Sequence, residues 1–187
     1  LGNPDKEYIF TRHNIGFFVL DDLAKASNAV FETNRLCFIV RIKYKGRSFI
    51  LIKPTTYMNL SGKAIKYWLE KEKISQEKLL VVLDDIALPF GTVRIKPNGS
   101  NGGHNGLKSI DEMLGNNNYA RMRFGVGNDF SKGKQSDYVL SNFSSDEIKL
   151  LPICIAQMKS AIYNFGLAGV QDTMSRFNGP VILPGNS

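Results

Sequence analysis

The sequence has little of several features on which common protein classes depend. Its two cysteines, Cys37 and Cys154, share no motif, so a disulfide framework is unsupported and a reducing compartment is favoured. No stretch has the roughly 18 apolar residues that a membrane span needs, and no signal peptide is present. We therefore expect a cytoplasmic protein with no membrane partner.

Several catalytic and nucleotide-binding motifs are also missing. There is no Gly-x-Ser-x-Gly elbow for a serine nucleophile, and neither cysteine lies near a glycine-rich turn with a histidine partner. The only histidines, His13 and His104, lack the local spacing of zinc ligands. Residues 102–109 are glycine-rich but lack the Gly-Lys-Ser adjacency of a P-loop. A loop that leads into a helix can still bind a phosphate through its N–H groups. We expect neither a metal nor a cofactor.

What the sequence does have is an excess of basic charge. Lys and Arg number 24 against 17 acidic residues, which gives a net charge of +7 and a pI near 9.4. This balance favours a polyanionic partner such as RNA or DNA, although a generically basic protein would show it too.

The pattern of the chain predicts alternating helices and strands. A helix capped by Asn14 is expected to residue 26, and β-rich runs at 36–44 and 48–53 are joined by a hairpin signal at Lys45-Gly46-Arg47. After a polar loop at 55–63 a helix is expected to about residue 71, and later strands are a buried one at 79–83 and two at 93–96 and 119–126. Further helices are expected at about 104–114, at 144–166, where Ser144 and Glu147 form a capping box, and at 167–176. We predict one α/β domain over residues 1–187, with a mixed sheet flanked by helices in three layers (α/β/α) and a flexible tail at 178–187.

His13 and Asp84 are the candidate base and its partner. His13 lies in a polar stretch, Thr11 to Gly16, where a helix begins, and Asp84 follows the buried strand. Ligand sites gather at the carboxyl ends of strands in open α/β sheets, and a carboxylate on one imidazole nitrogen fixes the tautomer for general-base work. The alternatives are a capping or surface role for His13 and a turn cap for Asp84.

Asparagines in loops form a second candidate group: Asn3, Asn14, Asn59, Asn101 and Asn105. An amide both donates and accepts hydrogen bonds, so such a cluster could hold a peptide backbone or stabilise an oxyanion. Turn and helix-capping roles are the alternative for each of them. Met58, beside Asn59, is more typical of a core than of a contact.

Basic residues on adjacent segments predict one RNA-binding patch. They are Arg94, Lys96, Lys108, Arg121, Arg123, Lys132 and Lys134. Alternation along a strand, as in Arg94/Lys96 and Arg121/Arg123, places side chains on one face. A solvated sheet face would show the same alternation.

Several motifs together resemble those of bacterial peptidyl-tRNA hydrolases. They are Gly2-Asn3-Pro4, Tyr8, Thr11-Arg12-His13-Asn14-x-Gly16, Lys53-Pro54-Thr55-Thr56-Tyr57-Met58-Asn59-Leu60-Ser61-Gly62, Asp84-Asp85, Leu88-Pro89-x-Gly91 and Gly102-Gly103-His104-Asn105-Gly106-Leu107-Lys108. The match runs in order from Leu1 to about Leu140. In two respects the chain departs from the family: Ala87 stands where an aspartate is usual, and the strand that normally precedes Leu1 is missing, which we attribute to truncation.

The resemblance implies a monomeric enzyme, without a cofactor, that cleaves the ester between a peptide and the 3′ end of tRNA. It implies that His13 is catalytic and is supported by Asp84. It further implies that Asn3, Tyr8, Met58, Asn59 and Asn105 bind substrate and that Lys96 and Arg123 contact tRNA. A non-catalytic RNA-binding protein and a small-ester hydrolase are the rival functions. Because only His13 has a carboxylate assigned to it, we expect His104 to shape the cleft wall.

Overall fold

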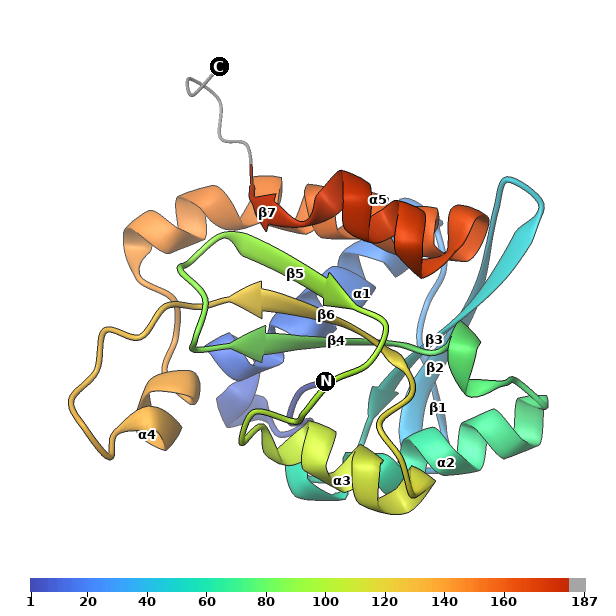
Figure 1. Ribbon diagram of the computed structural model, residues 1–187, viewed down its shortest axis with the longest axis horizontal. Coiled ribbons are helices and arrows are strands. Elements are labelled where there is room, and N and C mark those ends of the chain that lie inside the picture. Colours follow the sequence, from blue (N-terminus) through green and yellow to red (C-terminus); the bar gives the residue numbers. More distant parts are fainter. Residues whose placement is uncertain (182–187) are drawn as a thin grey trace.

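The buried aliphatic run forms the strand on which the fold is built. This strand, β4 (Leu80–Asp85), pairs in parallel with β6 (Ala120–Gly125). On its other edge β6 pairs antiparallel with β5 (Thr92–Lys96), which pairs with the short β7 (Gly179–Pro180). The sheet order β4-β6-β5-β7 confirms the predicted mixed sheet. The computed structural model describes residues 1–181 (Figure 1).

A second sheet holds the predicted hairpin. It consists of β1 (Glu32–Asn34), β2 (Cys37–Tyr44) and β3 (Arg47–Pro54), all antiparallel. Lys45 and Gly46 both have positive φ, the two-residue turn that matches the twist of a hairpin. The hairpin forms its own sheet because its apolar side chains pack on a helix: Cys37 and Ile39 share a cluster with Trp68 of α2 (Ser61–Glu72).

Helices cover both faces of the larger sheet, as the three-layer prediction requires (Figure 1). Val82 packs with residues of α1 (Ile15–Ala26) and α5 (Ser145–Phe177). Its neighbours Val81 and Leu83 point to the opposite face, where they pack with α2 and with α3 (Asn105–Leu114). Short helices complete the fold: η1 (Lys6–Tyr8), η2 (Arg12–Asn14), η3 (Met58–Leu60), η4 (Gln76–Lys78) and α4 (Gln135–Val139). No helix within residues 1–181 is long and apolar enough to cross a membrane.

The carboxyl-terminal part of the chain differs from prediction in two ways. The break expected near residue 166 lies at Gly169, whose φ of 81° and ψ of 178° interrupt α5, because only glycine adopts that conformation freely. The tail predicted as flexible from 178 is ordered as far as Val181. Asn178 exchanges two hydrogen bonds with the backbone of Ile95, and Val181 N donates to Gly91 O. The rest of the predicted tail lies outside the described residues.

Candidate active site

A cavity opens where the carboxyl end of β4 meets the beginnings of two helices. η2 leads directly into α1 on one face of the sheet, and α3 begins on the other. The cavity measures about 570 Å³ and is lined by Asn3, His13, Tyr57, Met58, Asn59, Asp84, Asp85, Ile86, Gly102, Gly103, His104, Asn105, Arg123, Gln135, Ser136, Val139 and Leu140. Its size suits a small substrate group rather than a whole macromolecule.

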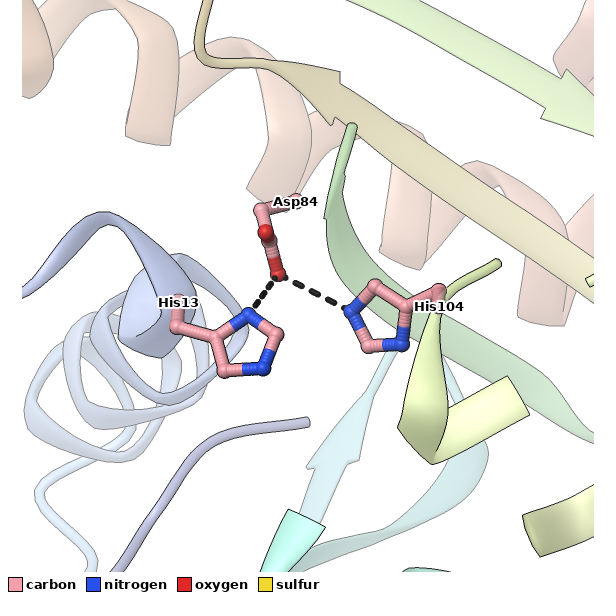
Figure 2. A group of neighbouring side chains, drawn as sticks. All are labelled: His13, Asp84 and His104. Carbon is pink, nitrogen blue, oxygen red and sulfur yellow. Dashed lines mark hydrogen bonds and ion pairs between the residues drawn. The ribbon is translucent and has the colours of Figure 1, made fainter. Parts of the chain in front are cut away.

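His13 and Asp84 meet as predicted. Nδ1 of His13 lies 2.8 Å from Oδ1 of Asp84, and the two residues are only 9% and 3% exposed (Figure 2). This contact fixes the proton of a neutral imidazole on Nδ1 and leaves the lone pair on Nε2. His13 therefore has the arrangement of a general base.

His104 also contacts Asp84, which corrects the expectation that His13 alone has a carboxylate partner. Nε2 of His104 lies 3.0 Å from the same oxygen, Oδ1 (Figure 2). The ring centroids of His13 and His104 are 5.0 Å apart. Its Nδ1 accepts hydrogen bonds from Gly106 N and Leu107 N, so His104 caps α3. Spacing along the chain could not reveal this contact, because it joins residues from different elements.

The capping bonds determine the tautomer of His104. An Nδ1 that accepts from two N–H groups carries no proton, so the ring proton lies on Nε2 and is donated to Asp84. Burial lowers the pKa of His104 below its ordinary 6.5, although Asp84 opposes this effect. The ring is therefore neutral at pH 7.

Asp84 is the charged member of the group. Burial raises its pKa, but the electrostatic attraction and hydrogen bonds of His104 and His13 together outweigh that effect, so the pKa lies well below its ordinary value. The carboxylate is ionised at neutral pH and accepts one N–H from each ring.

The same three side chains bring metal-ligand atoms within 4.8 Å of one another. To bind a metal, Nε2 of His104 would have to lose its proton to Nδ1, where it would collide with the capping N–H groups of α3. The residues present thus fit a hydrogen-bonded group better than a metal centre.

The asparagine at the start of α1 does not have the capping role predicted for it. The side chain of Asn14 instead accepts from Asn3 N at 2.7 Å and donates to Asn3 O at 2.9 Å. Oδ1 of Asn3 in turn accepts from Met58 N at 3.1 Å. This chain of bonds holds Asn3 and Met58 rigidly in the cavity wall.

The other predicted substrate-binding residues divide between the cavity and its surroundings. Asn59 on η3 and Asn105, the first residue of α3, line the cavity and are exposed to solvent. Tyr8 is not among the described residues that line it; it lies on η1. The role of Tyr8 in substrate binding stays a prediction.

The predicted basic patch is smaller than expected. Arg121 is fully buried, and its guanidinium donates to the carbonyls of Gly99, Ser100 and Asn117, so it fixes loops instead of facing a ligand. Arg123 lines the cavity and is bound to Asp85 at 3.1 Å and to Ser100 O at 2.7 Å. Lys96 is exposed on β5 but is not among the described cavity residues.

Arg12 has a structural role that the sequence did not reveal. It stacks over the rings of Tyr138 and Phe143 and donates to Glu147 at 2.7 Å. Further bonds reach Ser141 and the carbonyl of Asn142. Arg12 thereby ties the segment that carries His13 to the segment that forms the wall at Val139 and Leu140.

Comparison with known proteins agrees with the geometry. A family model described as peptidyl-tRNA hydrolase matches residues 1–183. Peptidyl-tRNA hydrolases of Cytophaga hutchinsonii and Phocaeicola vulgatus are each 53% identical over 178 residues, which is 95% of this chain and 95% of each relative. The crystal structure of peptidyl-tRNA hydrolase from Acinetobacter baumannii superposes with a TM-score of 0.90 at 31% identity, covering 96% of this chain and 92% of that one.

The family match spans nearly the whole chain, and the fold and the histidine–aspartate pair are those expected from the sequence. The chain belongs to the peptidyl-tRNA hydrolase family of ester hydrolases.

Proposed function

We propose that this chain releases tRNA from peptidyl-tRNA by hydrolysing the ester at the tRNA 3′ end, with His13 as the general base. The observation that carries the proposal is the 2.8 Å contact between His13 Nδ1 and the buried, ionised Asp84, which leaves Nε2 as the basic nitrogen at a cavity. Family membership supplies the substrate class.

The reaction needs no covalent enzyme intermediate. A water oxygen adds to the ester carbonyl carbon while its proton passes to Nε2 of His13, and Asp84 stabilises the resulting imidazolium. The tetrahedral intermediate then collapses, the bond to the ribose oxygen breaks, and that oxygen takes the proton back from His13. Because the pKa of Asp84 is held low, the proton stays on His13 between the two steps.

The asparagines supply the polar contacts of the proposed site. Asn59 and Asn105 carry amide donors suited to the developing oxyanion and to the peptide backbone. Asn3 is held by Asn14 and Met58, so its side chain is pre-organised. A pocket that hydrogen-bonds a peptide N–H disfavours a free charged amine. We therefore expect a preference for peptidyl over aminoacyl ends.

Lys96 and Arg123 are the proposed tRNA contacts. Lys96 is exposed and free to approach a phosphate. Arg123 uses part of its five N–H donors on Asp85 and Ser100, and the remainder can bind an anion at the cavity rim. We further propose that the enzyme acts as a monomer in the cytoplasm, where translation supplies its substrate.

The test is release of free tRNA from N-blocked aminoacyl-tRNA, with unblocked aminoacyl-tRNA and a simple ester as comparisons. We expect fast release from the blocked substrate only. Binding of tRNA without hydrolysis would indicate an RNA-binding protein, and cleavage of the simple ester at a comparable rate would indicate a general esterase.

Removing the proposed base gives the first prediction. His13→Ala is expected to lower kcat by roughly 10²–10⁴-fold, because proton transfer in the transition state is lost. Binding of tRNA, measured by filter retention or fluorescence, should stay within about twofold, since His13 is not a basic phosphate contact. Near-normal turnover in this variant would exclude His13 as the base.

A further inference from the structure

Among the described residues 1–181, His104 forms a hydrogen bond with Asp84 but has no task in the proposed mechanism. It is held from two sides. Its Nδ1 accepts from the first turn of α3, at 3.1 Å from Gly106 N and 3.4 Å from Leu107 N, and its Nε2 donates to Asp84 at 3.0 Å. Few rotamers satisfy both sets of bonds, so the ring is fixed relative to α3.

This arrangement also fixes Asp84. Oδ1 of Asp84 accepts from His104 as well as from His13, and a carboxylate oxygen has two lone pairs. The bond from His104 therefore sets the direction of the carboxylate independently of His13. A base is oriented well only if the group that orients it is itself held.

We propose that His104 is a positioning residue for the hydrolysis. Capping α3 with Nδ1, it donates Nε2–H to Asp84, so that Asp84 stays aligned with His13. This inference rests on the proposed role of His13, and it assigns to His104 a function beyond shaping the cavity wall.

The electrostatic surroundings agree with a neutral His104. The titratable groups that act on the ring are Asp84 and His13, while Asp85 and Arg123 lie in the same cavity wall. A hydrogen bond from a neutral donor weakens the pull of Asp84 on the His13 proton without adding a charge.

Two substitutions separate the two bonds of the ring. The amide oxygen of asparagine occupies the place of Nδ1 and is a preferred helix cap, so His104→Asn keeps the cap and loses the donor to Asp84. The amide nitrogen of glutamine occupies the place of Nε2, so His104→Gln keeps the donor and loses the cap. Each variant is the matched control for the other.

The measurements are kcat and KM for N-blocked aminoacyl-tRNA from pH 5 to 9, and the midpoint of urea unfolding at pH 7.5. For His104→Asn we expect a normal unfolding midpoint, a kcat lowered roughly tenfold with KM unchanged, and an acid limb of kcat/KM moved upward by roughly half to one pH unit. The acid limb moves to higher pH because Asp84, having lost the donor from His104, attracts the proton on His13 more strongly. For His104→Gln we expect a lowered unfolding midpoint with a pH profile close to that of the wild type.

If His104 were purely structural, kcat would fall in the variant whose unfolding midpoint is lowered, His104→Gln. The acid limb of kcat/KM would then stay at the wild-type pH in both variants. A wild-type profile in His104→Asn, or an equal shift of the profile in both variants, overturns the proposal. Failure of the proposed function is recognised separately, because His13→Ala would then keep normal turnover whatever the variants at position 104 do.

Discussion

Asp84 is hydrogen-bonded to Nδ1 of His13 but to Nε2 of His104, and this difference decides which ring can act as a base. His13 uses Nδ1 and leaves Nε2 basic, whereas His104 uses Nε2 and gives its Nδ1 to the helix. Both belong to a His-Asn dipeptide at a helix start, so similar local sequences have different chemistry. The ring that can accept a proton from water is the one whose second nitrogen is not engaged by the backbone.

The lowered pKa of His104 predicts how stability depends on pH. Below about pH 6.5 the unfolded chain binds a proton at this residue that the folded chain does not, so the free energy of unfolding falls as pH falls toward the lower folded pKa. We expect the free energy of unfolding of the wild type to fall more steeply than that of His104→Asn as the pH falls below about 6.5.

Urea unfolding of both proteins at half-unit pH intervals measures this difference. Parallel stability curves for the two proteins would show that His104 has the same proton affinity in the folded and unfolded chains.

At the scale of elements, the site depends on how closely α1 approaches β4. Gly16, in the first turn of α1, lies against the backbone of β4, and a Cβ there would come within 2.6 Å of Val82 O. Since His13 precedes α1 and Asp84 lies in the last two residues of β4, this contact sets the distance between the base and its carboxylate. The absence of a side chain at Gly16 thus allows the close approach that sets the distance between His13 and Asp84.

Gly16→Ala is expected to push α1 away from β4. Overpacking should lower the free energy of unfolding by roughly 1–3 kcal/mol, and displacement of His13 from Asp84 should lower kcat by roughly 10–100-fold. Lys25→Ala, an exposed position on the same helix, is the control and should leave both nearly unchanged. Thermal or urea unfolding and the tRNA-release assay measure the two effects; wild-type kcat in a folded Gly16→Ala protein would contradict the argument.

Local signals predicted the elements well, and contacts between distant elements only in part. The capping box of Ser144 and Glu147 and the turn at Lys45-Gly46 depend on neighbours in sequence and are confirmed. The pair His13 and Asp84 followed from the rule that sites lie at strand ends. The bond from His104 to Asp84 did not, because it depends on how α3 packs across β4. Alternation along the strand predicts an exposed Arg121, but loops cover this residue, and alternation carries no information about loops.

Over the whole molecule, the excess of basic charge is not spread evenly around the cavity. Of the directly opposed basic residues of β5 and β6, Arg94 and Lys96 are exposed while Arg121 is buried and Arg123 partly so. Only part of the net charge of +7 therefore faces a ligand near the site. Attraction of tRNA to the cavity rim should depend on a few exposed cations.

Lys96→Gln tests this dependence. Losing one phosphate contact should weaken tRNA binding and reduce the slope of log K against log salt by roughly 0.7–0.9, with kcat unchanged. Lys43→Gln is the matched control, because Lys43 is also an exposed lysine, on β2 in the other sheet. Binding measured at several salt concentrations gives the slopes, and equal slopes for Lys96→Gln and the wild type would remove Lys96 from the contact surface.

The bonds of Arg12 have a consequence for the order in which the protein acquires activity during its own synthesis. Arg12 reaches Glu147 and Ser141, more than a hundred residues further along the chain. His13 stands next to it, so the surroundings of the base stay incomplete until the ribosome has made the chain through Glu147. Contacts of such long range also slow folding. The proposed base can therefore be held in place only after the segment that binds Arg12 has been synthesised.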